Sequence, residues 1–413
     1  MKCRHCNTEL SHIFVDLDFE PISNAMLSKE QLNLPENYYP LKVFVCDKCF
    51  LVQLEEVKKA DQIFDSEYTY FSSFSSSWLA HAKKYVDMMV ARFGFSETSQ
   101  VIEIASNDGY LLQYFKEYGV PVLGIDPTAN TAAVAEAKGI PTIVDFFNSK
   151  LAQESLVDKG IKADLIIGNN VLAHVPNINN FVEGLKTALG ENGVITMEFP
   201  HLMQLVEQRQ FDTIYHEHFS YLSFICVKNI FEFHGLEMFD VEELPTHGGS
   251  LRIFAKHKYN TIHPVSVNVE LLLNKEIEAG MQTLDYYKGF QDRCEEIKLD
   301  SLEFLIQKKR LGKKVIGYGA AAKGNTLINF CGIHGTDLIN YVVDASPHKQ
   351  NKFLPGSHIP VVSMEKIKET KPDYVVILPW NLKNEIANSL NFIKEWDGKL
   401  VVFVPSLKED LII

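Results

Sequence analysis

Two Cys-x-x-Cys pairs near the start of the chain constrain its fold more than any other feature. Cys3 and Cys6 form the first pair, and Cys46 and Cys49 form the second. Two intervening residues let both sulfurs of a pair reach one ion, and four sulfurs complete a closed tetrahedral zinc site. The alternatives are four free thiols or a redox motif, which normally uses a single pair at a helix start. We predict a structural zinc ion, with no open position for catalysis, in a module over residues 1–66.

Length and charge exclude several broad classes of protein. The 413 residues exceed what one hydrophobic core usually supports, so two or three domains are expected. A net charge of −13 argues against a general nucleic-acid binder, although a small anionic ligand can still bind in a local basic pocket. An odd total of seven cysteines argues against a disulfide framework. No apolar run approaches the roughly 20 residues of a membrane span, and no signal peptide opens the sequence, so the expected location is the cytoplasm.

From residue 101 the hydrophobic pattern alternates between strands and helices. Alternating units of this kind imply a parallel sheet with helices on both faces. The last two strands are joined by a short turn, so we expect them to pair antiparallel at one edge. The pattern predicts a seven-stranded, doubly wound α/β sheet in a domain over residues 67–258. The predicted strands are 101–105, 121–126, 141–145, 164–169, 193–199, 236–243 and 250–257.

The remaining residues, 259–413, predict a charged helical linker followed by a second, smaller Rossmann-like α/β domain. Residues 265–310 are long enough for two helices, which we expect to pack between the domains. The strands predicted after them are 314–318, 339–343, 374–378 and 399–404.

Polar side chains follow the carboxyl ends of four successive predicted strands, where ligands of open α/β sheets bind. Small residues in the first of these turns let a ligand approach the backbone just before a helix N-terminus. Carboxylates after the second and third strands suit ribose hydroxyls and an adenine amino group, although each carboxylate alone would more simply cap a helix. We therefore predict a nucleoside site. The candidate residues are Glu103, Ala105, Asn107, Gly109, Asp126, Pro127, Asp145, Phe146, Asn169 and Asn170.

The segment Tyr215–Tyr221, with the sequence YHEHFSY, follows the fifth predicted strand and should lie over the same end of the sheet. It fails the zincin pattern, because Ser220 stands where the second histidine would be. We interpret it as an imidazole that moves a proton, a carboxylate that orients the imidazole, and phenols that donate hydrogen bonds. The alternative is a hydrogen-bonded core cluster, although so many titratable groups are costly to bury without a purpose.

A third motif, Gly317-x-Gly319-x-x-Ala322, follows a predicted strand and opens a helix, and Asp344 lies 22 residues further on. Taken alone it is a dinucleotide fingerprint and predicts NAD. Only 69 residues follow Asp344, however, which leaves little room for the substrate domain of an oxidoreductase. Plain packing of the helix on the strand is a further alternative. Two single histidines also stay ambiguous: His174 either touches an acceptor or caps a turn, and His247 lies in either a ligand-facing or a hairpin turn.

In their order along the chain these motifs resemble the class I S-adenosylmethionine (SAM) methyltransferases. More specifically they resemble the three-domain sugar C-methyltransferases that act on nucleotide-linked 4-keto-deoxysugars, and the resemblance covers nearly the whole chain. It implies SAM as cofactor, with Glu103, Asn107 and Gly109 on the methionine side, Asp126 on the ribose, and Asp145 with Phe146 on the adenine. It also implies His218 as general base, assisted by Tyr215 and Glu217, with either Tyr68 or Tyr70 reaching the sugar.

The same resemblance places the Gly317 segment against the nucleotide, with Lys323 and the amides after Gly319 on the diphosphate. The substrate-binding candidates are Tyr221, His174, His247, Gly319, Lys323 and Asn325. The expected reaction is deprotonation of C3 of a nucleoside-diphosphate-linked 4-keto-deoxysugar and methylation of the resulting enolate. The alternatives are an NAD-dependent nucleotide-sugar oxidoreductase, an O-methyltransferase and a zinc-anchored binding module. The expected partner is a small nucleotide sugar, neither nucleic acid nor membrane; the nucleotide, the stereochemistry and the oligomeric state stay open.

Overall fold

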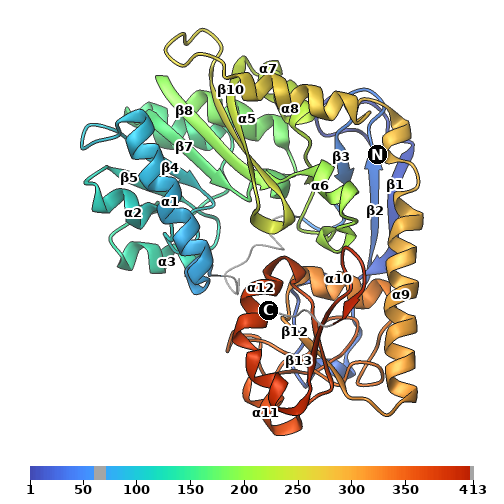
Figure 1. Ribbon diagram of the computed structural model, residues 1–413. Helices are drawn as coiled ribbons and strands as arrows, with labels where there is room; N and C mark the ends of the chain where they lie inside the picture. The colour runs from blue at the N-terminus through green and yellow to red at the C-terminus, as the bar shows by residue number, and fades with distance from the viewer. Residues whose placement is uncertain (60–70, 410–413) are drawn as a thin grey trace.

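The computed structural model describes residues 1–59 and 71–409, which form three sheets connected by helices (Figure 1). Tyr68 and Tyr70, the two alternatives for a tyrosine that reaches the sugar, lie outside the described residues.

The largest sheet has seven strands in the order β10-β11-β8-β7-β4-β5-β6. Strands β4, β5, β6, β7 and β8 are parallel, whereas β11 pairs antiparallel with both β8 and β10. This is the class I methyltransferase sheet expected from the sequence, including the antiparallel pair at one edge. The strands are β4 (Val101–Ile104), β5 (Val122–Ile125), β6 (Thr142–Ile143), β7 (Ala163–Asn169), β8 (Leu189–Pro200), β10 (Leu236–Leu244) and β11 (Ser250–His257).

Helices cover this sheet and begin where the local sequence supplies a cap. In the helix α1 (Ser76–Phe93), the side chain of Ser75 accepts a hydrogen bond from the backbone amide of Trp78, and Gly94 ends the helix in the left-handed region. The other helices of the domain are α2 (Leu112–Glu117), α3 (Ala129–Ala137), α4 (Ser149–Leu151), α5 (Ile178–Ala188), α6 (Leu202–Glu207) and α7 (Phe224–Phe233).

The N-terminal sheet is completed by a strand from the middle of the chain. Its order is β1 (His12–Glu20), β2 (Tyr39–Val45), β3 (Val52–Leu54) and β9 (Ser220–Tyr221). Strand β9 pairs antiparallel with β3, which places the end of the YHEHFSY segment in the cysteine-bearing module. The sequence did not predict β9, because a two-residue strand is too short to show an alternating pattern.

The C-terminal sheet has six strands in the order β14-β13-β12-β15-β16-β17, all parallel except for β17 at one edge. Its helices are α10 (Ala322–Phe330), α11 (Glu365–Thr370) and α12 (Lys383–Ser389). The smaller α/β domain is therefore confirmed. The strands are β12 (Val315–Tyr318), β13 (Val342–Val343), β14 (Val361–Val362), β15 (Tyr374–Ile377), β16 (Lys399–Val402) and β17 (Lys408–Glu409).

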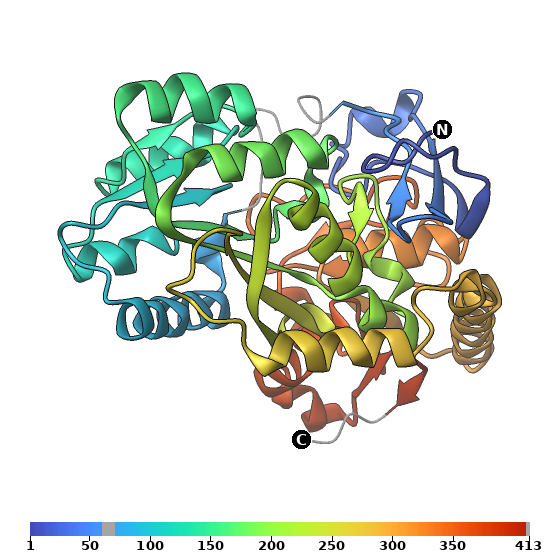
Figure 2. The same cartoon turned by 90° about the horizontal axis from the view of Figure 1, so that it is seen from above.

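The predicted charged linker forms two helices, α8 (Val267–Glu278) and α9 (Phe290–Arg310). Helix α9 runs beside β1 and down to the C-terminal sheet (Figures 1 and 2). At its start Phe290 stacks on Phe14, with ring centroids 4.5 Å apart, and further along Phe304 meets Tyr374 edge-on at 5.4 Å. One continuous hydrophobic core thus joins the N-terminal strands, α9 and the C-terminal sheet.

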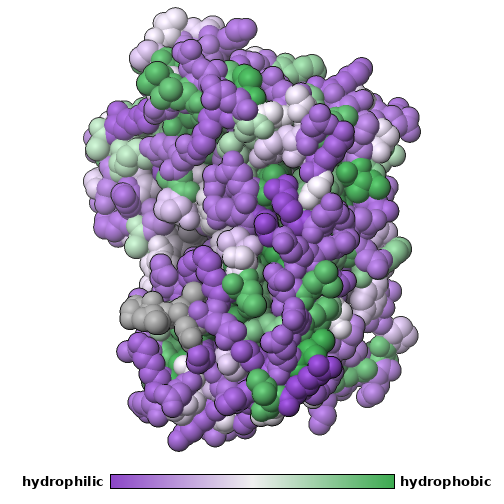
Figure 3. Space-filling model, turned by 45° about the vertical axis from the view of Figure 1, so that its right-hand side comes forward, coloured by the Kyte–Doolittle hydropathy of each residue, from purple (hydrophilic) through white to green (hydrophobic). Residues whose placement is uncertain are grey.

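Most of the surface side chains around α9 are polar. On the face drawn in Figure 3 hydrophilic residues predominate, and apolar residues occur in scattered patches. Within residues 1–59 and 71–409, no helix combines the length and apolar character that a membrane crossing requires.

A buried carboxylate of helix α8 makes hydrogen bonds to the methyltransferase domain, in addition to the apolar contacts of Val269 and Leu272. Glu276 is fully buried and accepts hydrogen bonds from the backbone amides of Phe224 and Ile225, at 2.7 and 2.8 Å. Its Oε1 also lies 2.7 Å from His201 Nε2. These amides belong to the first turn of α7, where helical N–H groups have no partner within the helix.

We expect Glu276→Ala to destabilise the protein by about 3–5 kcal/mol, because it leaves two buried amides and a histidine unpartnered. Thermal unfolding followed by calorimetry measures this effect. Glu278→Ala is the matched control, since Glu278 is exposed two residues further along the same helix. Equal unfolding temperatures for the two variants would contradict the assigned role of Glu276.

Candidate active site

The turn after β4 is tied to the carboxylate at the end of β5. The amide of Asn107 donates to Asp126 Oδ2 at 2.8 Å, and Asn107 Oδ1 accepts from the amide of Ser72 at 2.9 Å. Gly109 has a φ of 74°, and a Cβ there would come within 2.4 Å of Ile140 Cδ1, so this turn requires glycine. The structure thus brings the first two groups of nucleoside-site candidates together.

Asp126, the carboxylate candidate at the end of β5, also caps a helix. This is the simpler role that the sequence left open. Asp126 is buried, and its Oδ1 accepts from the amide of Thr128 at 2.9 Å and from the hydroxyl of Thr131 at 3.1 Å, in the first turn of α3. The neighbouring candidates differ: Asp145 is exposed and Phe146 is half-buried at the end of β6. Ribose and adenine contacts of these residues stay predictions.

Glu103, at the end of β4, is completely buried. Burial raises its pKa well above the usual range, the hydroxyl of Tyr110 opposes this rise, and the carboxylates of Asp126 and Asp108 add to it. A positive charge placed beside Glu103 would lower this pKa and favour the ionised carboxylate.

The end of β7 presents two amide oxygens to the same space. Asn169 and Asn170 each have a buried Oδ1 with no hydrogen-bond partner among the described residues. Their amide nitrogens are engaged: Asn170 Nδ2 donates to His247 Nε2 at 3.1 Å, and Asn169 Nδ2 donates to the hydroxyl of Tyr110 at 3.4 Å. Two buried acceptors without donors fit a polar ligand at this strand end.

A buried cluster at the end of β8 was missed by the sequence analysis. Glu198 is fully buried and accepts from Arg252 Nη2 at 2.7 Å and Thr246 Oγ1 at 2.9 Å, and its Oε2 lies 2.9 Å from His81 Nε2. The ring of Trp78 stacks on His81 and also contacts Tyr110 and His247. Its position in the sequence could have identified it, because Glu198 lies at the end of the fifth predicted strand. We named no candidate at that strand end.

The imidazole of His218 is held in one orientation by a backbone carbonyl. His218 Nδ1 lies 2.9 Å from the carbonyl oxygen of Thr213, and a carbonyl only accepts hydrogen bonds, so Nδ1 carries the proton. Burial lowers the pKa of His218 well below its usual range, and His174, Lys323 and His247 lower it further. The ring is therefore neutral at physiological pH, and its Nε2 is the basic atom.

Glu217 does not orient this imidazole, contrary to our expectation. Its Oε1 accepts from Asn24 Nδ2 at 2.6 Å, in the N-terminal module. Burial raises the pKa of Glu217 to about 6, while Asn24 and the charge of Lys349 lower it. The sequence placed the two side chains together because they are adjacent, but in this turn they contact different parts of the protein.

The aromatic candidates of the segment lie at different distances from the imidazole. The ring centroid of Tyr215 is 4.0 Å from that of His218, and the ring of His174 is 4.6 Å away. Burial lowers the pKa of His174 to about 4, so this second imidazole is also neutral. Tyr221 is further away, at 6.2 Å, and its ring belongs to the hydrophobic core, which indicates a structural contribution from that residue.

Residues of the C-terminal domain face the same imidazoles. The charge of Lys323 lowers the pKa of both His218 and His247. Its Nζ donates to Asn381 Oδ1 at 2.9 Å and lies over the ring of Trp380. Asn325 is buried, and neither polar atom of its side-chain amide has a hydrogen-bond partner within the described residues.

In the Gly317-x-Gly319 turn after β12, the carboxylate of Asp344 accepts hydrogen bonds from nearby backbone amides. Asp344 accepts from the amide of Ala320 at 2.7 Å through one oxygen and from the amide of Ser346 at 2.8 Å through the other. Gly319 adopts a φ of 90°, and a Cβ there would come within 2.6 Å of Pro379 Cδ. The carboxylate of Asp126 in the larger sheet is held by two backbone amides in the same way, so these contacts do not distinguish a dinucleotide-binding turn from plain packing of the helix on the strand.

The four N-terminal cysteines form one cluster. Their sulfurs all lie within 4.8 Å of one another, and both Cys3–Cys49 and Cys6–Cys46 are 3.5 Å apart. Tetrahedral zinc with Zn–S bonds near 2.3 Å requires sulfurs about 3.8 Å apart, so the cluster fits this metal. Gln53 Nε2 donates to Cys3 Sγ at 3.3 Å from strand β3, which fixes one ligand from outside the pairs.

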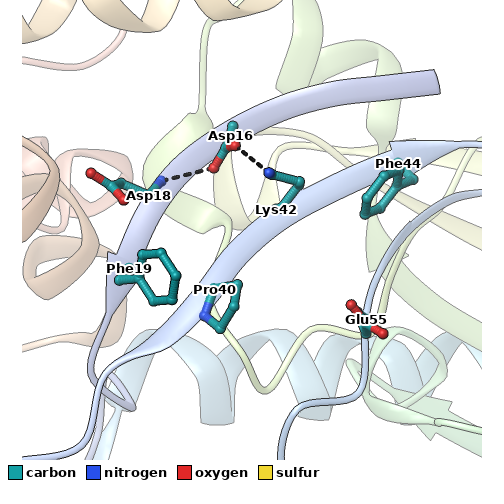
Figure 4. Close-up of a pocket in the computed structure, with 7 residues that line it drawn as sticks. All are labelled: Asp16, Asp18, Phe19, Pro40, Lys42, Phe44 and Glu55. Atoms are coloured by element: carbon teal, nitrogen blue, oxygen red, sulfur yellow. Dashed lines mark hydrogen bonds and ion pairs between the residues drawn. The ribbon is translucent and has the colours of Figure 1, made fainter. Parts of the chain in front are cut away.

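A pocket of about 260 Å³ lies elsewhere, on the outer face of β1 and β2 (Figure 4). Its polar groups are an ion pair between Lys42 and Asp16, at 2.7 Å, and two further carboxylates. It contains none of the predicted site residues. The lining residues are Asp16, Asp18, Phe19, Pro40, Lys42, Phe44 and Glu55.

We expect loss of zinc to disturb the YHEHFSY segment as well as the cysteine module. Strand β3 follows the second cysteine pair directly and pairs with β9, so Cys49→Ser should lower the zinc content and speed amide hydrogen exchange over residues 215–222. Metal analysis and exchange mass spectrometry measure the two effects. Cys294→Ala removes a buried thiol outside the cluster and is the control. Zinc loss with unchanged exchange would contradict the coupling.

Comparison with known proteins matches the chain in three consecutive parts. A zinc binding domain model matches residues 3–64, a methyltransferase domain model matches 78–241, and a model described as the C-methyltransferase C-terminal domain matches 245–405. The C-methyltransferase NovU of Streptomyces niveus is 35% identical over 404 residues, which are 98% of this chain and 95% of the relative.

More distant matches cover only part of the chain. A ubiquinone biosynthesis O-methyltransferase of Bartonella quintana (strain Toulouse) is 26% identical over 99 residues, 24% of this chain and 40% of that protein. Magnesium protoporphyrin IX methyltransferase from Synechocystis PCC 6803, solved with bound SAM, has 16% identity and a TM-score of 0.34, covering 43% of this chain and 79% of its own; at this TM-score the likeness adds no argument. The three family models and the full-length relative show that the chain belongs to the C-methyltransferases, SAM-dependent enzymes, here with a four-cysteine zinc site.

Proposed function

We propose that this enzyme methylates C3 of a nucleoside-diphosphate-linked 4-keto-deoxysugar through an enolate. The observation that carries the proposal is the buried, neutral His218, whose Nδ1 proton is engaged by the Thr213 carbonyl and whose Nε2 is therefore the basic atom. Transfer of a methyl group to carbon requires such a base, because carbon becomes nucleophilic only after it loses a proton. A 4-keto group acidifies the neighbouring C3–H bond enough for imidazole to remove the proton.

In the proposed reaction the C3 proton moves to His218 Nε2, and its electron pair forms the enolate with the 4-keto oxygen. Hydrogen-bond donors near that oxygen stabilise the developing charge, and Tyr215 is the phenol that packs closest to the imidazole among the ring contacts described. The enolate carbon is the nucleophile that the methyl donor would alkylate, with the S–CH3 bond breaking and the neutral thioether as leaving group, and the imidazolium returns its proton to solvent. Burial of the imidazole favours this return, because it disfavours the charged ring.

SAM supplies the electrophilic methyl group when it is bound. The residues that would hold it lie at the ends of β4, β5, β6 and β7, where the oxygens of Asn169 and Asn170 and the buried carboxyl of Glu103 would accept hydrogen bonds from it. These groups are fixed before the ligand arrives, so they orient the donor without a large cost in side-chain entropy.

The anionic end of the substrate is proposed to bind at the C-terminal domain. Lys323 provides a half-buried cation whose charge lowers the pKa of the imidazoles, and the buried amide of Asn325 offers both a donor and an acceptor. This local cation allows a protein with a net charge of −13 to bind a diphosphate without a broad basic surface. Tyr68 and Tyr70 stay the alternatives for a tyrosine that reaches the sugar.

We expect His218→Gln to lower the rate of methyl transfer by about 10²- to 10⁴-fold, because glutamine accepts no proton at physiological pH. SAM binding should be retained. Mass spectrometry of the methylated sugar and calorimetric titration with SAM measure the two quantities. His12→Gln is the control, since His12 is exposed at the start of β1. Normal turnover in the His218 variant would remove this residue from the mechanism.

Solvent exchange separates the proposed C-methylation from O-methylation. With S-adenosylhomocysteine in place of SAM, the enzyme should still remove the C3 proton, so deuterium from heavy water should enter C3 of the keto sugar. Nuclear magnetic resonance of the recovered sugar measures the exchange, and a reaction without enzyme corrects for spontaneous enolisation. An enzyme that binds the sugar without exchanging this proton would favour the O-methyltransferase alternative.

A further inference from the structure

One short turn carries two groups that act on different parts of the site. The turn η7 (Phe211–Thr213) offers the Thr213 carbonyl to His218, as described above. Its middle residue, Asp212, is fully buried, and Asp212 Oδ2 accepts from the indole nitrogen of Trp380 at 2.8 Å. Asp212 Oδ1 has no hydrogen-bond partner among the described residues. A carboxylate of the methyltransferase domain is thus buried against the C-terminal domain.

Lys323 lies on the same indole. Its Nζ is 5.1 Å from the centre of the Trp380 ring and donates to Asn381 Oδ1 at 2.9 Å. Asp212 and Lys323 form no ion pair within 4.0 Å in the part of the chain that the structure describes, but one indole contacts both: its nitrogen donates to the carboxylate, and its ring face lies under the ammonium. Trp380 therefore links the carboxylate and the ammonium across the boundary between the two domains.

The titratable groups that respond to Lys323 come from three elements: Asp212 on η7, His218 on the following segment, and His247 in the turn before β11. Both imidazoles are neutral, since burial lowers the pKa of His218 well below its usual range and that of His247 to about 4. Burial raises the pKa of Asp212 to about 6, so its carboxyl is ionised above that pH. Asp212 is therefore the negative charge that faces the ammonium.

We propose that Asp212 is a positioning residue for the methyl-transfer reaction, which keeps Lys323 charged and aligned on Trp380 beside the catalytic imidazole. Burial opposes the charge on Lys323 and lowers its pKa, and the carboxylate of Asp212 opposes that decrease. The same turn holds the base through Thr213, so one turn sets both the proton acceptor and the substrate-binding cation. The inference rests on the proposed function in one respect: the anion bound by Lys323 is taken to be the substrate diphosphate.

The sign of the expected effect follows from the charges. Without the carboxylate, only the neutral oxygen of Asn381 and the ring face of Trp380 offset the desolvation of the ammonium, so Lys323 should lose its proton at a lower pH. The uncharged amine binds an anion poorly, and the KM of the nucleotide sugar should therefore rise with pH, whereas kcat at saturating substrate should change little. A purely structural role for Asp212 would alter both quantities at every pH.

The test measures the pKa of Lys323 directly, in the absence of substrate. Acetylation of Lys323 by acetic anhydride is followed by mass spectrometry from about pH 7 to about pH 11, because only the neutral amine reacts. In Asp212→Asn we expect the pKa of Lys323 to fall by about one pH unit and the KM at about pH 9 to rise about tenfold relative to wild type. Asp212→Glu should restore both, and Lys323→Arg in the Asp212→Asn background should remove the pH dependence, since arginine keeps its charge.

A second variant keeps the test decisive if Asp212→Asn does not fold. Trp380→Phe removes the indole donor that holds the carboxylate and should lower the pKa of Lys323 in the same direction. Trp396→Phe is the matched control. The indole of Trp396 donates to the carbonyl of Pro372 at 2.9 Å, in the same domain and away from Asp212 and Lys323. An unchanged Lys323 pKa in Asp212→Asn, or in Trp380→Phe where Asp212→Asn does not fold, would overturn the inference.

The two proposals fail in different ways. If no 4-keto sugar is methylated but the Lys323 pKa falls as expected, the proposed function is wrong and the charge partnership stands. If a keto sugar is methylated but the Lys323 pKa and the pH dependence of KM do not change in Asp212→Asn, Asp212 has no such role.

Discussion

The pairing of β9 with β3 is the interaction on which the rest of the active site depends. It anchors the last residues of the YHEHFSY segment in the sheet of the cysteine module, and so it joins the zinc site to the segment that carries His218. The segment is otherwise a loop, and a loop alone would not hold an imidazole at a defined distance from the strand ends of another sheet. Zinc held by the four cysteines would therefore also stabilise the segment that carries the proposed base, His218.

Burial is the second constraint, and it explains why so many imidazoles occur at this site without mutual repulsion. His174, His218 and His247 all have lowered pKa values, because their charged forms are poorly solvated. A cluster of neutral imidazoles can lie beside the cation of Lys323, which further disfavours their protonation. The cost of burying that cation is offset by the carboxylate of Asp212, across the Trp380 indole.

Much of this was predictable from the sequence, and the omissions share a cause. The seven-stranded sheet, the two-helix linker and the smaller C-terminal sheet each follow a local period, and the four cysteines follow a fixed spacing. Asp212, Glu198 and Trp380 were missed because each matters through one long-range contact and belongs to no local pattern. The expected partnership of Glu217 with His218 was wrong for the same reason, since neighbours in sequence were assumed to be neighbours in space.

The sequence by itself determined the type and order of the elements, the zinc ligands and the residue types available for proton transfer, since these depend on local spacing and chemistry. Only the tertiary structure decided which groups meet. In the folded protein Thr213 is the hydrogen-bond partner of His218, Glu217 contacts Asn24, Asp344 holds its own turn, and the ammonium of Lys323 lies over Trp380. Orientation, burial and charge pairing arise between segments far apart in the chain, and no local pattern encodes them.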